Sequence, residues 1–158
     1  MAYVKLGVLV VVVSATMIAG CTPMQIKPLP LVKEGDKSTI VIYRENSLNA
    51  GAIKMIFGSD KNDYFFLYNK DYASLQVPSG EHEIFVRSDQ ADNPYKLKAL
   101  LANNEVKCFK AYANPANYAK ALLGGIAYMT GNTFLMNEIA CFNEEQLKEY
   151  SKVGYSGT

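Results

Sequence analysis

The chain contains no tryptophan, one histidine and three cysteines among its 158 residues. General acid–base catalysis or a nucleophile triad would therefore depend on His82, since histidine most often carries out these steps. The single histidine and the lack of a close cysteine pair also argue against a zinc site. The motifs G-x-S-x-G and H-E-x-x-H and the P-loop motif are missing from the sequence. We therefore expect a protein that is not an enzyme and that has no metal or other cofactor.

The sequence also lacks an excess of either charge, with 16 Lys and Arg residues against 15 Asp and Glu residues. This balance argues against nucleic acid or an anionic membrane surface as the main partner. Tyrosine and phenylalanine are plentiful, with 11 and 7 residues, and aromatic residues favour β-strands. The composition therefore predicts a β-rich domain that does not bind nucleic acid.

The first 20 residues have the layout of a secretory signal peptide. Lys5 is their only charged residue, residues 6–13 are continuously apolar, and small or weakly polar residues follow from Ser14. The apolar run is too short for a membrane span, which needs roughly 20 apolar residues. We therefore expect residues 1–20 to be removed from the mature protein.

The end of this segment, Ile18-Ala19-Gly20-Cys21, resembles the lipobox of bacterial lipoproteins. The resemblance implies cleavage before Cys21, a diacylglyceryl group on its thiol and an acyl chain on the new amino terminus. Several acyl chains together anchor a protein stably to a membrane. The next residue is Thr22 and not aspartate, which by resemblance to Gram-negative lipoprotein sorting implies the outer membrane, with the domain facing the periplasm.

Residues 21–37 follow the expected cleavage site and contain three of the six prolines. Because proline fixes φ and has no amide donor, we expect an extended tether between the lipidated cysteine and the domain. An alternative is that part of this segment packs along the edge of the domain as an irregular strand.

Cys108 and Cys141 remain after Cys21 is assigned to the anchor. In an oxidising compartment they can form a disulfide, and closing a loop of about 30 residues would contribute roughly 3 kcal/mol. The alternative is a pair of buried free thiols that pack as small hydrophobic groups. The sequence leaves both alternatives open.

Short runs of β-branched, aromatic and alternating residues, separated by turn residues, fill the rest of the chain. Seven strands recur at roughly 8–12-residue spacing, which is typical of an antiparallel sandwich. They are expected at residues 39–45, 50–57, 64–68, 72–77, 81–88, 95–101 and 106–113. A last strand at 133–142, a short helix at 144–150 and a flexible tail at 151–158 follow. We predict a mostly β protein with one antiparallel β-sandwich domain over residues 38–150.

Residues 116–130 interrupt the strand pattern. Asn114-Pro115 suits the start of a helix, but Gly124-Gly125 weakens one, so we expect a short helical or irregular insertion. No charged side chain occurs from 121 to 129, and such a segment must be covered. It either completes the core or forms a contact surface for an envelope protein or the membrane. The candidate contact residues are Leu122, Leu123, Ile126, Tyr128 and Met129.

Three polar side chains and one aromatic run are further candidates. His82 alternates with Ile84 and Val86, which predicts a structural histidine on the core side of its strand. Arg44 is expected to form a surface ion pair with an acid such as Glu83, an interaction that contributes little. The aromatic residues at 64–72 indicate either a central strand covered on both faces or a platform for a small ligand or glycan.

Two short segments resemble a known family. Ile42-Tyr43-Arg44 ends the first predicted strand, and Val77-Pro78-Ser79-Gly80-Glu81-His82 forms a turn followed by a strand. With the later aromatic strand and the Gly-rich stretch, they resemble a family of small bacterial lipoproteins of unknown function, over about residues 38–142. The resemblance extends to PEGA-like and carboxypeptidase-regulatory-like β-sandwiches, although Ser79 stands where the family usually has Pro-Gly directly.

The resemblance implies the sandwich fold and brings no activity, substrate or cofactor with it. We therefore expect a membrane-anchored lipoprotein of the bacterial cell envelope that acts as a non-enzymatic binding or scaffolding module in an envelope assembly. The alternative is a lipoprotein that binds a small ligand or glycan through surface aromatic residues.

Overall fold

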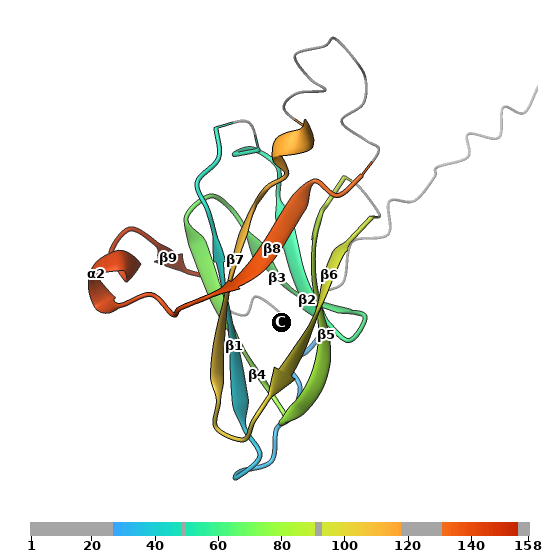
Figure 1. The fold of residues 1–158 in the computed structure, drawn as a ribbon, viewed down its shortest axis with the longest axis vertical. Helices are drawn as coiled ribbons and strands as arrows, with labels where there is room; N and C mark the ends of the chain where they lie inside the picture. Colours follow the sequence, from blue (N-terminus) through green and yellow to red (C-terminus); the bar gives the residue numbers. More distant parts are fainter. Residues whose placement is uncertain (1–26, 49, 91–92, 118–130, 155–158) are drawn as a thin grey trace, which may run out of the picture.

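The computed structural model describes residues 27–48, 50–90, 93–117 and 131–154, which form two β-sheets packed face to face (Figure 1). The five-stranded sheet has the order β8-β7-β1-β4-β9, and the four-stranded sheet has the order β3-β2-β5-β6. The predicted β-sandwich is therefore confirmed. The strands are β1 (Ser38–Arg44), β2 (Met55–Ser59), β3 (Asn62–Leu67), β4 (Asp71–Val77), β5 (Gly80–Ser88), β6 (Tyr95–Leu101), β7 (Val106–Ala113), β8 (Phe134–Ile139) and β9 (Ser151–Lys152).

Neighbouring strands are antiparallel except in two pairs. β1 runs parallel to β7, with Thr39 opposite Val106 and Arg44 opposite Ala111, and β4 runs parallel to β9. Parallel neighbours need a long crossover connection, and between β1 and β7 the chain builds the whole second sheet and β4. The five-stranded sheet is therefore mixed, whereas the sequence predicts an entirely antiparallel sandwich.

The hydrophobic core lies between the two sheets. Successive side chains of a strand point to opposite faces, and this places Ile40 and Ile42 of β1 in the core. β2 lies between β3 and β5 and is buried at all five of its positions. The core between the sheets therefore holds them together.

Several element boundaries differ from the predicted ones. β2 begins at Met55 and not at residue 50, because the Ile53 amide donates to the Ala50 carbonyl (3.1 Å) and closes a turn there. The predicted C-terminal helix at 144–150 is shorter in the structure, where α2 spans Glu144–Leu147, and it is capped by Asn143, whose side chain accepts from the Gln146 amide.

The tail that was predicted to be flexible from residue 151 begins with an ordered strand. Ser151 and Lys152 form β9 beside β4, and the Val153 amide donates to the Tyr72 carbonyl (2.8 Å). Val153 also packs against the core, and this apolar contact together with the backbone bonds holds the segment in place. Residues 155–158 lie outside the described residues.

The described part of the predicted tether, residues 27–37, contacts the domain at several points. The Lys27 amide donates to the Asp63 carbonyl of β3 (3.0 Å), and the Asp36 carboxylate accepts from the Ser79 amide (3.0 Å). This agrees with the alternative in which part of the segment packs along the domain edge. No helix in the described part of the chain is long and apolar enough to cross a bilayer.

Candidate functional site

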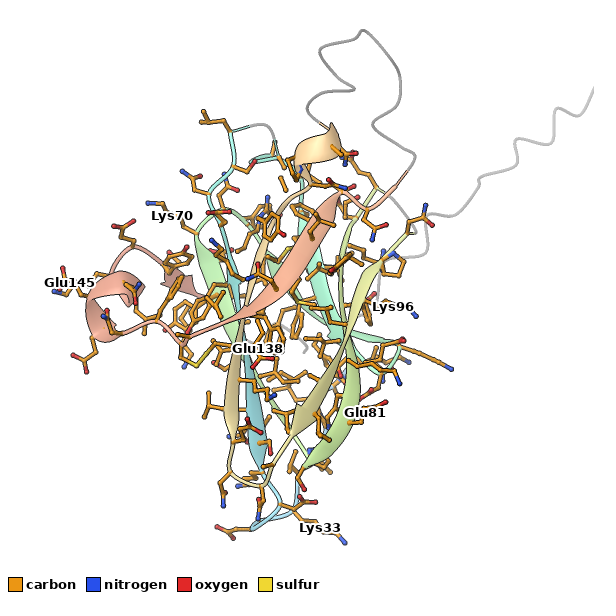
Figure 2. The ribbon with its side chains drawn as sticks, viewed as in Figure 1. Lys33, Lys70, Glu81, Lys96, Glu138 and Glu145 are labelled. Atoms are coloured by element: carbon orange, nitrogen blue, oxygen red, sulfur yellow. A yellow bond between two sulfur atoms is a disulfide. The ribbon has the colours of Figure 1, made fainter. Side chains whose placement is uncertain are left out.

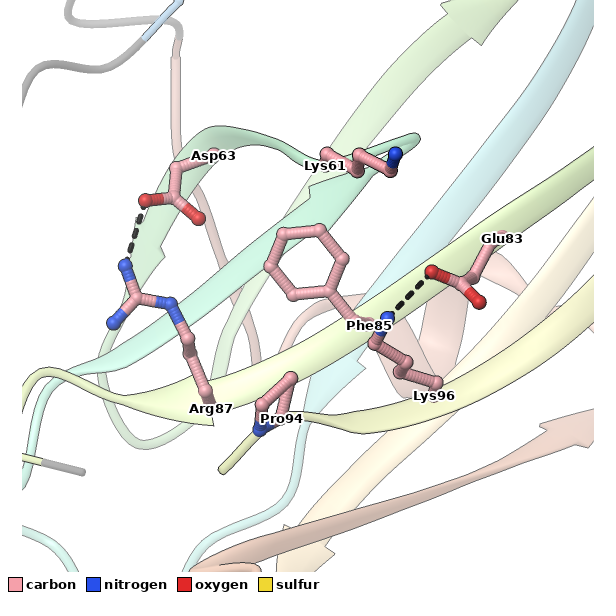
Figure 3. Close-up of a pocket in the computed structure, with 7 residues that line it drawn as sticks. All are labelled: Lys61, Asp63, Glu83, Phe85, Arg87, Pro94 and Lys96. Atoms are coloured by element: carbon pink, nitrogen blue, oxygen red, sulfur yellow. Dashed lines mark hydrogen bonds and ion pairs between the residues drawn. The ribbon is translucent and has the colours of Figure 1, made fainter. Parts of the chain in front are cut away.

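A shallow hollow lies on the outer face of the four-stranded sheet (Figure 3). Its volume is about 280 Å³, close to the lower limit of roughly 300 Å³ for pockets that bind small molecules. Alternation along β5 predicts that its charged residues share a face with Phe85, and the hollow forms on that face. The lining residues are Lys61, Asp63, Glu83, Phe85, Arg87, Pro94 and Lys96.

Two ion pairs flank the Phe85 ring, one on each side (Figure 3). Arg87 Nη2 donates to Asp63 Oδ2 (2.7 Å), and Lys96 Nζ donates to Glu83 Oε1 (2.7 Å). Within the described segments, Lys61 is the cation of the hollow that has no ion pair. The hollow can therefore accept a small ligand with an anionic group near Lys61, but such a ligand competes with existing pairs for the other two cations.

Phe85 forms the floor of the hollow because the facing position on β2 is a glycine. Gly58 is paired with Phe85, and a Cβ at Gly58 would overlap the Phe85 ring and the Asn62 carbonyl oxygen. The ring therefore lies over the backbone of β2 and is buried although it points away from the core. This close approach requires glycine at position 58.

The ring of His82 links two segments of the backbone through hydrogen bonds. Its Nδ1 lies 2.7 Å from Asp60 Oδ2, and its Nε2 lies 2.9 Å from the Pro78 carbonyl oxygen. Both ring nitrogens face acceptors, so both bonds form when both nitrogens carry protons. Because both nitrogens are engaged and the side chain is only 12% exposed, the ring is not placed to exchange a proton with a substrate.

Asp60 organises the turn between β2 and β3. Asp60 and Lys61 both have positive φ values, 50° and 71°, as in the tight hairpin turns that suit twisted strands. Partial burial works to raise the pKa of the Asp60 carboxyl, but hydrogen bonds from His82, the Glu83 amide and the Ser59 hydroxyl outweigh it and lower that pKa. Asp60 therefore stays ionised and links the turn to β5.

Arg44 is the largest departure from the sequence-based expectation. The predicted surface ion pair between Arg44 and Glu83 is wrong, because Glu83 pairs with Lys96 and Arg44 is only 1% exposed. Its Nη1 donates to the Leu67 carbonyl (2.5 Å) and its Nη2 to the Ala50 carbonyl (2.6 Å).

The Arg44 side chain also has an aromatic neighbour, and the Asp71 and Asp89 carboxylates partly offset the effect of burial on its pKa. The guanidinium lies 5.0 Å from the centre of the Phe134 ring, and Nε has no partner among the described residues. Burial lowers the pKa of the guanidinium to about 10, so it remains charged at neutral pH. Arg44 joins β1, the loop before β2, the end of β3 and β8, and its role is to hold that end of the sandwich together.

The aromatic residues at 64–72 do not form one continuous surface. Tyr64 and Phe65 are buried, and Tyr72 is half-buried beside Tyr43. Tyr68 is 48% exposed at the end of β3. β3 is also an edge strand of its sheet and not the central strand that was predicted, because β2 alone pairs with it.

The structure joins Cys108 and Cys141 in a disulfide, with 5.1 Å between their Cα atoms. Cys108 belongs to a second, smaller hydrophobic cluster on the outer face of the five-stranded sheet, with Val41 and Tyr43. Ile139 at the end of β8 and the later residues Phe142, Leu147 and Tyr150 are partly buried and pack against this cluster. The sequence suggested this disulfide but gave no sign of the aromatic cluster around it.

The remaining predicted site residues lie outside the described residues. These are the lipidation residue and the candidate contact residues: Cys21, Leu122, Leu123, Ile126, Tyr128 and Met129. In the segments that the structure describes, no group of three or more His, Cys, Asp or Glu side chains is arranged to hold a metal ion. Comparison with models of protein families gives no match for this chain, and comparison with curated proteins gives none either.

Proposed function

We propose that this protein is a lipid-anchored component of the bacterial cell envelope that binds another envelope protein and catalyses no reaction. The observation that carries the proposal is the Ile18-Ala19-Gly20-Cys21 sequence at the end of an apolar leader, directly before a short segment and a β-sandwich. In this proposal Cys21 carries the acyl chains, the anchor lies in the outer membrane and the sandwich faces the periplasm.

The disulfide supports an exported location. Disulfides persist in oxidising compartments such as the periplasm and are rare in the cytosol. Cys108 and Cys141 are joined across the outer face of the five-stranded sheet, and neither competes with Cys21 for the anchor. The leader and the disulfide are independent features of the chain that favour the same compartment.

The arrangement of polar groups supports binding over catalysis. His82 has both ring nitrogens in hydrogen bonds, and the Asp63 and Glu83 carboxylates of the hollow are each paired with a cation. A general acid or base needs a free position within hydrogen-bond reach of a substrate. A binding module has no such requirement.

The proposed contact with the partner is made by the apolar residues Leu122, Leu123, Ile126, Tyr128 and Met129. In-cell cross-linking in the native host tests it by comparing wild type with Ile126→Asp, using Val106→Asp as the matched control at an exposed apolar position on β7. We expect Ile126→Asp to lose the cross-linked species and the control to retain it. Retention of the same species by a folded Ile126→Asp variant would remove this segment as the contact.

Fractionation of host cells tests the anchor. Wild type should sediment with the outer membranes and leave them only when detergent is added. Cys21→Ala should not be lipidated and should therefore not show this detergent-dependent extraction. Cys141→Ser is the control, because it removes a different cysteine and keeps the anchor. Detergent-dependent extraction that is identical for wild type and Cys21→Ala would contradict lipidation.

A second candidate function is the binding of a small anionic ligand or glycan in the hollow. The observation that favours it is Lys61, an exposed cation beside Phe85 at the edge of a hollow of about 280 Å³. Titration with a panel of acidic sugars and peptides, followed by the NMR signals of β5, tests this function. Unchanged signals for both wild type and Lys61→Ala at millimolar ligand would exclude it for that panel.

A further inference from the structure

The segment after β8 crosses the outer face of the five-stranded sheet and ends beside β4 (Figure 1). We call residues 140–153, which include α2 and β9, the C-terminal strap. Figure 2 shows Glu145 of α2 on the outer side of the strap and Lys70 near its end. The strap covers the small aromatic cluster around Tyr43.

Besides the disulfide, the strap is held on the sheet by the short β9 pairing, the Val153 contact with the core, an exposed Lys70–Glu149 ion pair and two aromatic contacts with Tyr43. Phe142 stacks on Tyr43 with 4.2 Å between ring centres, and Tyr150 packs edge-on against Tyr43 at 5.9 Å. None of the residues of α2 is fully buried, and β9 has only two residues. Exposed backbone bonds and half-buried side chains are typical of segments that open at low free-energy cost. Apart from the main chain that continues from β8, the disulfide is the one covalent bond between the strap and the sheet among the described residues.

The two cysteines of this bond have different surroundings. Cys108 is 1% exposed and lies under the strap, whereas Cys141 is an exposed residue at the start of the strap. A thiolate must reach a sulfur in line with the disulfide bond, so access decides which sulfur is attacked. The burial difference directs attack to Cys141.

Tyr43 is placed to assist departure of the other sulfur. Its hydroxyl lies 3.6 Å from Cys108 Sγ, and because the disulfide sulfur has no proton, the hydroxyl is the donor. Burial raises the pKa of the Tyr43 phenol, so it keeps its proton at neutral pH. A hydrogen bond to the departing sulfur stabilises the negative charge that develops on it.

We propose that Cys141 is a thiol–disulfide exchange site for a dithiol oxidoreductase of the envelope, and that exchange releases the C-terminal strap from the sheet. A thiolate of the oxidoreductase attacks Cys141 Sγ and forms a mixed disulfide. The Cys141–Cys108 bond breaks, and its electron pair goes to Cys108 Sγ, which takes a proton from water. The thiolate of the second cysteine of the oxidoreductase then attacks the oxidoreductase sulfur of the mixed disulfide. That bond breaks, its electron pair goes to Cys141 Sγ, which takes a proton from water, and the oxidoreductase leaves with an internal disulfide while both cysteines of this chain are thiols.

Release of the strap would uncover the outer face of the sheet at Val41, Tyr43 and Tyr72. These side chains lie on neighbouring strands β1 and β4 and are covered by Phe142 and Tyr150 in the oxidised protein. The exchange site does not depend on lipidation of Cys21, so its test and the tests of the anchor can fail separately.

The first experiment uses purified protein in a Cys21→Ala background with reduced glutathione as the attacking thiol, quenched with acid and mapped by peptide mass spectrometry. We expect the glutathione adduct on Cys141 at least tenfold in excess over Cys108. We expect Tyr43→Phe to slow formation of this adduct severalfold with the same site preference. Equal adducts on the two cysteines, or a preference for Cys108, would overturn the assignment of Cys141, and an unchanged rate in Tyr43→Phe would overturn the role of the hydroxyl.

The second experiment measures release of the strap. In Cys141→Ser the Cys108 thiol is free but remains covered if the strap stays in place. We expect iodoacetamide to modify Cys108 in this folded variant, and amide hydrogen exchange at residues 140–153 to accelerate at least tenfold more than exchange in β1 and β2 does. Continued protection of both Cys108 and the strap amides would overturn the release.

Discussion

Replacement of Arg44 by methionine tests whether a buried cation holds one end of the sandwich. The side chain is 1% exposed, and its two terminal nitrogens donate to the Leu67 and Ala50 carbonyls. Methionine fills a similar apolar volume but has no donor. The change therefore removes both charged-donor hydrogen bonds, leaves the Ala50 carbonyl with the Ile53 amide as its donor, and removes the cation–π contact with Phe134.

The expected loss of stability follows from these contacts. Each of the two lost hydrogen bonds from the charged guanidinium contributes about 1.5–3 kcal/mol. The lost cation–π contact adds roughly 1–2 kcal/mol. The variant no longer buries a cation, a relief of up to several kcal/mol that offsets part of the loss. We expect a net decrease of about 2–3 kcal/mol in the free energy of unfolding, a large share of the roughly 5–15 kcal/mol of a typical domain.

Urea unfolding followed by tyrosine fluorescence and circular dichroism measures this decrease. With a slope of about 1–3 kcal/mol per molar urea, the midpoint should fall by about 0.7–3 M. Lys98→Met is the matched control, because Lys98 is 74% exposed in a pair with Glu81, and its midpoint should not change measurably. An Arg44→Met midpoint equal to or above that of wild type would refute the argument that the Arg44 hydrogen bonds stabilise the fold.

Three further changes have defined outcomes. Gly58→Ala should lower the free energy of unfolding by about 1–3 kcal/mol, because the added Cβ has no room beside the Phe85 ring. Gly154→Ala is the control and should cause no such loss, because nothing lies within 4 Å of the added Cβ. Equal melting temperatures for the two variants would show that β2 can shift to make room. The Asp60 carboxyl has a lowered pKa in the folded state, so its contribution is present above the ordinary value of 3.8 and is lost as the pH falls through the folded value. Thermal melts from pH 6 to pH 2 should therefore show a smaller acid-induced loss for Asp60→Asn than for wild type, and parallel curves would contradict this. Cys141→Ser removes a bridge between residues 33 apart and should cost about 3–4 kcal/mol by calorimetry, whereas a loss below 1 kcal/mol would mean that the reduced chain is already constrained.

Local patterns in the sequence predict most of the fold. Apolar runs, alternation and turn residues give six strands within about two residues of their observed bounds, since most of these strands have one face in the core and a polar turn at their end. The parallel pairing of β1 with β7 was missed, because pairing between distant strands depends on the three-dimensional path of the chain. β9 was missed because two residues are too few to show a pattern.

The candidate site was only partly predictable. The shared face of Glu83, Phe85 and Arg87 follows from alternation, but the hollow also needs Gly58, which places the Phe85 ring against β2. The burial of Arg44 could not be predicted from the residues next to it in the sequence. Its acceptors are backbone carbonyls 6 and 23 residues away, and an arginine at a strand end is otherwise typical of the surface.

The central claim is that the thiol of Cys21 carries the lipid that holds this domain at a membrane. Intact-mass spectrometry of the protein, extracted with detergent from its host, tests it most directly. The predicted result is a chain that begins at Cys21 and carries the added mass of a diacylglyceryl group and one amide-linked acyl chain. A chain that keeps residues 1–20, or one whose sulfur at position 21 is unmodified, would contradict the claim.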